Sequence, residues 1–294
     1  MTRLLTIALI GLGTQLIDGA LGMAYGVTTT SLLLGYGLAP AVASASVHLA
    51  ELGTTSASAL SHWRLKNVDW PTVRPLVIPG FVGAFCGAVV LSSISADKAA
   101  PWMAGVLCVL GIYVLLRFTV LGSPPALRRG DGKPLSRWLL APLGVVGGFM
   151  DAAGGGGWGP ICTPALLSTG RLEPRKVIGS VDTSEVIVAL GASAGFLTSL
   201  GSKDLDATVI AGLVAGGVIA APLAAYLVRL LPPRILGAAV GGLIVMTNVD
   251  TITAAAGING PVRTLAYATV AAAWAAALLF AITQLRREQQ PATS

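Results

Sequence analysis

The sequence predicts an all-α integral membrane protein with two inverted repeats of about five helical segments each, whose glycine-broken helices meet near the bilayer midplane. Three observations support this fold class. The 294 residues are 54% hydrophobic and only 11% charged, with a mean hydropathy of +0.79, whereas soluble domains are about 25% charged. Long apolar segments recur along the chain. A glycine-rich motif that follows an aspartate occurs twice.

Apolar segments follow one another from end to end of the chain. The first half contains segments at 4–21, 27–38, 41–63, 73–95 and 99–120. The second half contains segments at 138–153, 159–170, 176–200, 207–228 and 233–250, and a further one follows at 262–284. The second segment of each half is shorter than the ~20 residues that a spanning helix needs. These two segments either cross the membrane or turn back within it.

The two halves resemble each other, which indicates an internal duplication. Aligning Asp18 with Asp151 also aligns Tyr25 with Trp158. After one inserted residue, further matched pairs are Ser46 with Ser180, His48 with Asp182, and Glu51 with Glu185. Each half therefore carries an aspartate before a glycine-rich motif and a glutamate in its third segment.

The basic residues favour one topology, because Lys and Arg concentrate in cytoplasmic loops. If the short segments cross and the N-terminus is outside, nearly all of the 19 basic residues lie inside. The exceptions are Arg3, Lys98, Lys203 and Arg263. If the short segments turn back and the N-terminus is inside, the basic residues at 171–176 and 286–287 move outside and the bias weakens. We therefore expect crossing, and an odd number of crossings per half inverts one half relative to the other.

The chain divides into two membrane repeats without a soluble domain. Residues 1–121 form the first repeat, and residues 138–285 form the second repeat with a C-terminal helix. Residues 122–137 are expected to be a basic cytoplasmic linker, and residues 286–294 a cytoplasmic tail. We expect a multi-pass protein of the cell inner membrane or plasma membrane.

The glycine-rich motifs predict breaks in two helices. They read MDAAGGGGWGP at 150–160 and IDGALGMAYG at 17–26. Consecutive glycines disfavour a helix, and free backbone polar groups at membrane depth are tolerated only beside protein or a water-filled cavity. The sequence therefore predicts that both motifs border a cavity.

Two stretches make the chain resemble a known family. Residues 17–70 read IDGALGMAYGVTTTSLLLGYGLAPAVASASVHLAELGTTSASALSHWRLKNVDW, and residues 147–160 read GGFMDAAGGGGWGP. With these motifs the chain resembles the sulfite exporter TauE/SafE family over nearly its whole length. The resemblance implies a membrane transporter of sulfite, sulfonates or related sulfur-containing or organic anions, commonly an exporter. It leaves the particular anion, the direction and the coupling ion open.

The glycine-rich breaks are candidate anion-binding sites, because free N–H groups at a helix N-terminus carry partial positive charge. Alternatively, the glycines only permit close helix packing. The tryptophan and tyrosine of the motifs either offer an N–H and an O–H to the anion or anchor at the interface. The predicted substrate-binding residues are Gly22, Tyr25, Gly26, Thr28, Ser46, His48, Gly154, Gly155, Gly156, Gly157, Trp158 and Ser180.

The acidic residues at or near membrane depth are costly to bury and are therefore candidates for function. They are Asp18, Glu51, Asp151, Asp182 and Glu185. The aspartates at the breaks either accept backbone N–H bonds as scaffolds, carry a proton, or are ordinary helix ends. The glutamates lie three residues after His48 and Asp182, on the same helical face, where they carry protons or are simply satisfied by neighbouring helices.

The leading function is secondary transport of a small anion, with an anion channel and a membrane-embedded enzyme as alternatives. No HExxH, GxSxG, Walker or paired-cysteine signature occurs, so we expect no enzyme, no cofactor and no metal site. The net charge of +6 lies in short gaps between apolar segments, where it acts as a topology signal and not as a nucleic-acid surface. The expected partners are the substrate, the lipid bilayer and a second copy in a homodimer.

Overall fold

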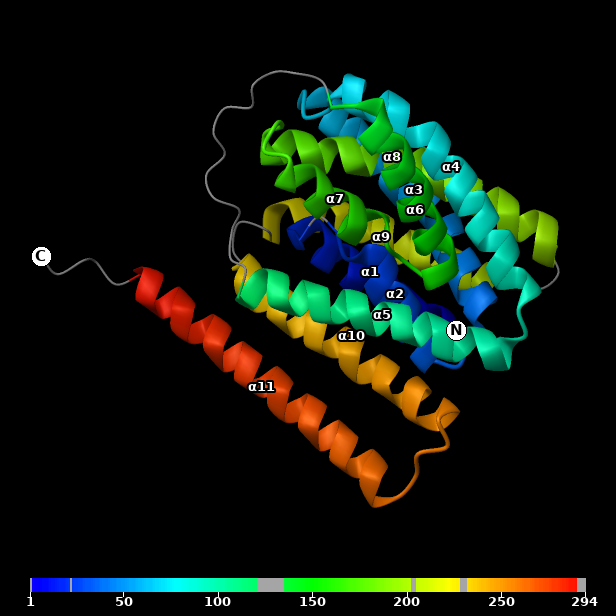
Figure 1. Cartoon of the computed structure of the whole chain (residues 1–294), viewed down its shortest axis with the longest axis vertical. Helices are drawn as coiled ribbons and strands as arrows, with labels where there is room; N and C mark the ends of the chain where they lie inside the picture. Colours follow the sequence, from blue (N-terminus) through cyan, green and yellow to red (C-terminus); the bar gives the residue numbers. More distant parts are fainter. Residues whose placement is uncertain (1, 22, 121–134, 202–204, 228–231, 290–294) are drawn as a thin grey trace, which may run out of the picture.

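The computed structural model describes residues 2–21, 23–120, 135–201, 205–227 and 232–289, and within these it is all-α (Figure 1). The helices are α1 (Thr2–Leu21), α2 (Tyr25–Gly35), α3 (Pro40–Arg64), α4 (Trp70–Ser93), α5 (Ala96–Thr119), α6 (Arg137–Gly154), α7 (Trp158–Ser168), α8 (Pro174–Leu200), α9 (Ala207–Leu227), α10 (Pro233–Ala255) and α11 (Pro261–Gln289). The predicted all-α membrane fold is confirmed, and most helix bounds lie close to the predicted ones.

Local sequence explains where several helices begin. Pro40, Pro174 and Pro233 occupy the first turns of α3, α8 and α10, where a missing N–H costs nothing and the fixed φ suits a helix. The Asp69 carboxylate accepts the Thr72 N–H at 3.1 Å and caps α4. These helices therefore start at positions that the sequence marks.

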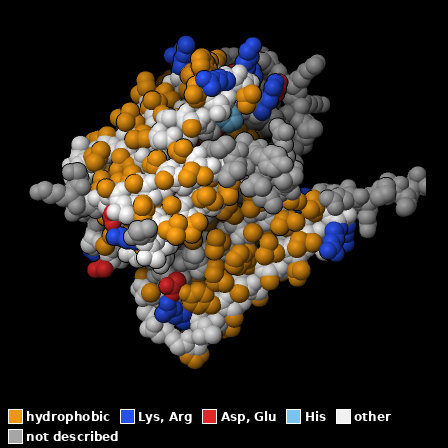
Figure 2. Space-filling view, turned by 180° about the vertical axis from the view of Figure 1, so that it is seen from behind, with side chains coloured by type: hydrophobic (Ala, Val, Ile, Leu, Met, Phe, Trp, Pro, Cys, Tyr) orange, Lys and Arg blue, Asp and Glu red, His pale blue; other side chains and the backbone are white. Residues whose placement is uncertain are grey.

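The helices form a membrane-spanning bundle. By length and composition, α4, α5, α8, α10 and α11 can each cross a bilayer. Hydrophobic side chains are spread over the face shown in Figure 2, and basic side chains lie mainly at its edges. Helices α2 and α7 have 11 residues each, which rise about 16 Å, roughly half of the hydrocarbon thickness. The protein is therefore a multi-pass membrane protein.

The helices pack in pairs that join the two halves of the sequence. Helix α4 lies along α6, α1 lies along α9, and α5 lies along α10. Helix α11 packs mainly on α10 at the outside of the bundle (Figure 1), and almost none of its apolar stretch is buried. Its apolar surface is therefore available to lipid.

The matched helices α3 and α8 run antiparallel. The His48 ring lies 6.0 Å from the Phe196 ring at one level, and the Asp69 N–H donates to Ser180 Oγ at 2.8 Å at another. Within α3, Ser58 Oγ donates to Asp182 Oδ2 of α8, so later residues of α3 face earlier residues of α8. The end of α3 and the start of α8 lie at one face of the bundle, as the crossing topology predicts. The inverted relation of the complete halves stays a prediction.

The orientation in the membrane is a prediction that cysteine labelling can test. Most of the predicted linker 122–137 and the end of the tail 286–294 lie outside the described residues. Leu65, at the end of α3, should face the cytoplasm, and Asn259, between α10 and α11, should face outside. After removal of the three native cysteines, Asn259→Cys should react with an impermeant thiol reagent in intact cells, whereas Leu65→Cys should not. The opposite labelling pattern would reverse the topology.

Small residues let α4 and α6 pack closely. A Cβ on Gly148 would lie 2.2 Å from the Gly80 carbonyl oxygen, whereas a Cβ on Gly105 would meet nothing within 4 Å. We expect Gly148→Leu to destabilise the protein by about 1–3 kcal/mol or more, because the helices must separate. Gly105→Leu should have little effect. Thermal unfolding in detergent, monitored by size-exclusion chromatography, gives the melting temperature of each variant. Equal melting temperatures for the two variants would contradict the packing argument.

Candidate functional site

Each helix break is held by the aspartate that precedes it. At the break between α6 and α7, Asp151 Oδ1 accepts the N–H groups of Gly157 and Trp158 at 2.8 and 3.0 Å. At the break between α1 and α2, Asp18 Oδ1 accepts the N–H groups six and seven residues further along, at 2.8 and 3.1 Å. The two aspartates thus make the same pair of bonds at the same spacing, and they satisfy free donors at the starts of α2 and α7.

The two breaks touch each other at Gly156 and Gly26. Gly156 has φ of +136°, a conformation that side chains other than glycine rarely adopt. A Cβ there would lie 2.4 Å from the Val27 nitrogen and 2.6 Å from the Gly26 carbonyl carbon. A Cβ on Gly26 would lie 3.2 Å from both Gly156 Cα and Glu51 Oε1. Backbone therefore packs directly on backbone where the two halves meet.

Several of the predicted anion donors are already used inside the protein. The Gly156 N–H donates to the Asp151 carbonyl, and the next two N–H groups donate to the Asp151 carboxylate. The Trp158 indole N–H donates to the Val181 carbonyl at 3.1 Å. Gly154 packs on Val106. The carboxylate of Asp151 thus occupies the position in which an anion would meet the backbone N–H groups of Gly157 and Trp158.

The other predicted substrate-binding residues differ in their surroundings. Gly155 is the left-handed residue that ends α6, with φ of +79°, and Gly22 lies outside the described residues. Ser46 donates to the carbonyl four residues earlier, and Ser180 accepts the Asp69 N–H. The hydroxyls of Thr28 and Tyr25 are buried without a hydrogen-bond partner. Tyr25 alone of these hydroxyl residues lines the cavity described next.

A narrow polar cavity in two parts lies between the two breaks, α3 and α8, and we call it the acidic chamber. Its carboxyl groups are Asp18, Glu51, Asp151, Asp182 and Glu185, and Tyr25 and Gly157 also line it. Glu51 and Asp151 are almost fully buried. The chamber leaves room for about one water molecule in each of its two parts. No Lys or Arg of the described residues lines it.

His48 bridges two carboxylates beside the chamber. Its Nδ1 lies 3.5 Å from Glu51 Oε2, and its Nε2 lies 3.4 Å from Asp151 Oδ2. All three side chains are buried, and none of these four atoms has a hydrogen-bond partner. One ligand atom from each residue also lies within 4.8 Å of the others, a spacing open to a metal ion. Because the carboxylates face opposite ring nitrogens, a shared metal would break one contact, and we interpret the cluster as a proton-sharing bridge.

Asp182, which matches His48 in the repeat alignment, has different partners. Its Oδ2 accepts a hydrogen bond from Ser58 Oγ at 2.8 Å and lies 3.3 Å from His62 Nε2. Neither Ser58 nor His62 is among the site residues that the sequence predicts. Their spacing of four residues places them on one face of α3, and this spacing was the signal that could have indicated them. The structure adds that this face is turned towards α8.

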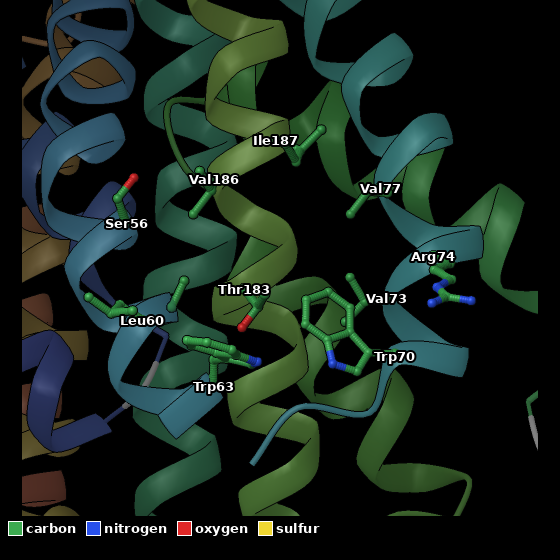
Figure 3. Close-up of a pocket in the computed structure, with 11 residues that line it drawn as sticks. Ser56, Leu60, Trp63, Trp70, Val73, Arg74, Val77, Thr183, Val186 and Ile187 are labelled. Carbon is green, nitrogen blue, oxygen red and sulfur yellow. The ribbon is translucent and has the colours of Figure 1, made fainter. Parts of the chain in front are cut away.

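A larger groove lies elsewhere, between α3, α4 and α8 (Figure 3). It has a volume of about 680 Å³, and Leu60, Trp63, Trp70, Val77 and Ile187 give it a mainly apolar lining. It is open at the surface of the bundle, where hydrocarbon is the expected solvent. Its charged lining residue, Arg74, points away from the other labelled side chains in Figure 3. The acidic chamber is therefore the better candidate for a site that binds a polar substrate.

The scaffold role of Asp151 can be tested by comparing two substitutions. Asp151→Ala leaves the Gly157 and Trp158 N–H groups without a partner, at about 1–3 kcal/mol for each buried donor, whereas Asp151→Asn keeps an acceptor oxygen. We expect the alanine variant to melt at a clearly lower temperature than the asparagine variant in detergent. Equal melting temperatures would show that these hydrogen bonds do not hold the break.

The chain is similar to one known protein family and to two curated proteins. The model of the family described as sulfite exporter TauE/SafE matches residues 7–251. The chain is 52% identical to "Probable membrane transporter protein YtnM" of Bacillus subtilis (strain 168), over 97% of this chain and 94% of that protein. It is 27% identical to "Probable membrane transporter protein YdhB" of the same organism, over 65% of this chain and 77% of that protein. No solved structure gives a significant match.

Proposed function

The chain belongs to the sulfite exporter TauE/SafE family and is a membrane transporter, and from this premise we propose that it is a secondary transporter that exports a small anion. The proposed substrate class is sulfite, which the family description names, or a sulfonate or a related sulfur-containing or organic anion, which the resemblance to the family implies. The protein then carries out no covalent chemistry and needs no cofactor. We further propose a homodimer, the commonest oligomer.

The carboxyl groups of the acidic chamber are the main support for the proposed mechanism. Five carboxyl groups face a narrow space that no described Lys or Arg lines. An anion cannot enter such a space while the carboxyl groups are ionised, because like charges in a low-dielectric interior repel strongly. Protonation removes the repulsion and converts each carboxyl group into a hydrogen-bond donor. We therefore propose that the anion is transported together with protons held by Glu51 and Glu185.

His48 is a buried group to which a proton on Glu51 can be transferred. A proton on His48 is shared with Glu51 through Nδ1 or with Asp151 through Nε2. Asp151 also holds the break between α6 and α7 through its other oxygen. Proton movement across the bridge would change the charge on the group that fixes this break. Protonation and the shape of the break are thereby linked.

Transport by this site requires that the chamber open alternately to either side. In the structure the chamber has room for about a single water in each part, so it represents a closed form. The breaks at Gly26 and Gly156 lie at the contact between the two halves, where rocking of one half against the other would open the space.

Flux in sealed vesicles distinguishes a carrier from the alternative of an anion channel. Vesicles that contain the purified protein are loaded with unlabelled sulfite and placed in labelled sulfite. A carrier gives saturable flux and transient accumulation of label by counterflow. Flux that does not saturate and shows no counterflow would indicate a channel and would contradict the proposal.

A second candidate function is transport of a small cation, because a cavity with five carboxyl groups and no described Lys or Arg in its lining also suits a cation. The same vesicles separate the two functions. Counterflow of sodium or of a small organic amine, with no counterflow of sulfite or of a sulfonate, would favour the cation.

A further inference from the structure

His62 connects the acidic chamber to the surface of the protein. It lies in the last turn of α3, and its side chain is 23% exposed, whereas His48 has no exposed surface. The His62 Nε2 lies 3.3 Å from Oδ2 of Asp182, whose side chain is 15% exposed. The Asn67 side-chain amide lies 3.5 Å from the other ring nitrogen of His62. One face of this imidazole therefore meets a carboxylate, and part of the ring reaches solvent.

Asp182 reaches the chamber from the same position. It lines both parts of the chamber together with Asp18 and Glu185. Its Oδ2 is also held by the Ser58 hydroxyl at 2.8 Å. A single carboxyl group thus faces a partly exposed imidazole on one side and the other carboxyl groups of the chamber on the other.

The groups around His62 favour a protonated ring. Asp182 on α8 is its direct partner, and Asp18 on α1 acts on it from a greater distance. At the start of α4, the Asp69 carboxylate is engaged by Thr72. The basic residues that follow on its own chain segment, Arg64 and Lys66, are exposed to solvent. Negative charge is therefore supplied to His62 from two other helices, whereas the neighbouring positive charges of Arg64 and Lys66 are exposed to solvent.

We propose that His62 transfers protons between water and Asp182, and so connects the acidic chamber to the aqueous phase at the end of the bundle where α3 ends and α8 begins. In the transfer, the Nε2–H bond of the imidazolium breaks, the proton adds to Asp182 Oδ2, and neutral imidazole and a carboxylic acid result. The imidazole then takes a proton at Nε2 from a hydronium ion of the aqueous phase, which becomes water. This role rests on the proposed proton-coupled transport. The crossing topology predicts that this end is cytoplasmic.

The two matched positions then have different tasks. His48 bridges two buried carboxylates and has no exposed surface, whereas Asp182 faces the partly exposed His62. The first position holds a proton inside the bundle, and the second exchanges protons with water through His62, a residue of the first repeat. A transporter that couples an anion to a pH gradient needs both functions.

The test separates proton supply from anion exchange. Vesicles with an imposed pH gradient measure driven accumulation of sulfite, and counterflow measures exchange that needs no net proton movement. We expect His62→Ala and His62→Gln to lower the initial rate of driven accumulation about 10-fold or more, while counterflow persists. Added imidazole, a small diffusible proton carrier, should restore driven accumulation in His62→Ala but not in Ser61→Ala, the matched control, which should behave as the wild type throughout.

The outcomes distinguish the possible failures. Driven accumulation at the wild-type rate in both His62 variants would overturn the role of His62. Loss of both driven accumulation and counterflow, without rescue by imidazole, would also overturn it, because His62 would then have only a structural role. If the wild type itself shows no counterflow of sulfite or of a sulfonate, the proposed function fails and the role of His62 falls with it.

Discussion

Gly156→Val is expected to abolish anion transport. The substitution places a Cβ 2.4 Å from the Val27 nitrogen and imposes a side chain at φ of +136°, so the two helix breaks must move apart. Those breaks border the acidic chamber through Gly26 and Gly157. We expect counterflow at the level of empty vesicles and a lower melting temperature in detergent.

A matched glycine controls for the general effect of a branched side chain. Gly35 ends α2, and a Cβ there would meet nothing within 4 Å. Gly35→Val should therefore insert into the membrane and transport as the wild type does. Gly156→Val protein that inserts normally and retains wild-type counterflow would show that contact between the breaks is not needed for transport.

Replacing Glu51 and Glu185 with glutamine is expected to separate anion exchange from the pH gradient. Glutamine keeps size and hydrogen bonding but cannot ionise. In the doubly substituted protein the chamber loses two groups that can take up and release protons, so the gradient can no longer drive the anion. We expect driven accumulation to fall to the passive level while counterflow continues.

The control for this experiment is a glutamate outside the chamber. Glu173 precedes α8, and its side chain is half-exposed beside Arg175. Glu173→Gln changes the formal charge by the same amount as either single chamber substitution, and it should leave driven accumulation unchanged. Undiminished accumulation in the doubly substituted protein would eliminate the two glutamates as the coupling site.

Local patterns in the sequence were sufficient to predict the helices. Apolar runs end at polar or proline-containing gaps, and Pro40 and Pro174 lie in the first turns of helices as their geometry requires. The repeat alignment also placed Asp18 and Asp151 at matched positions, and the structure gives them the same pair of backbone hydrogen bonds. These features depend on residues only a few positions apart.

Contacts between distant residues could not be predicted in this way. The bond from Ser58 to Asp182 joins residues 124 positions apart, and no periodicity in one helix tells which partner it will face. Similarly, the glycine run at 154–157 indicated free N–H donors, but only the structure shows that the Gly157 N–H donates to the Asp151 carboxylate and the Gly156 N–H to the Asp151 carbonyl. The acidic character of the chamber arises because five residues from four helices converge there.

The most direct test of the central claim measures protons that move with the anion. Vesicles with a weakly buffered interior and a pH-sensitive dye are supplied with methanesulfonate, whose charge stays constant near neutral pH. The account predicts that saturable sulfonate flux is accompanied by at least one proton per anion in the same direction, and that Glu51→Gln with Glu185→Gln removes this proton movement. Saturable sulfonate flux without any proton movement in the wild type would contradict the account.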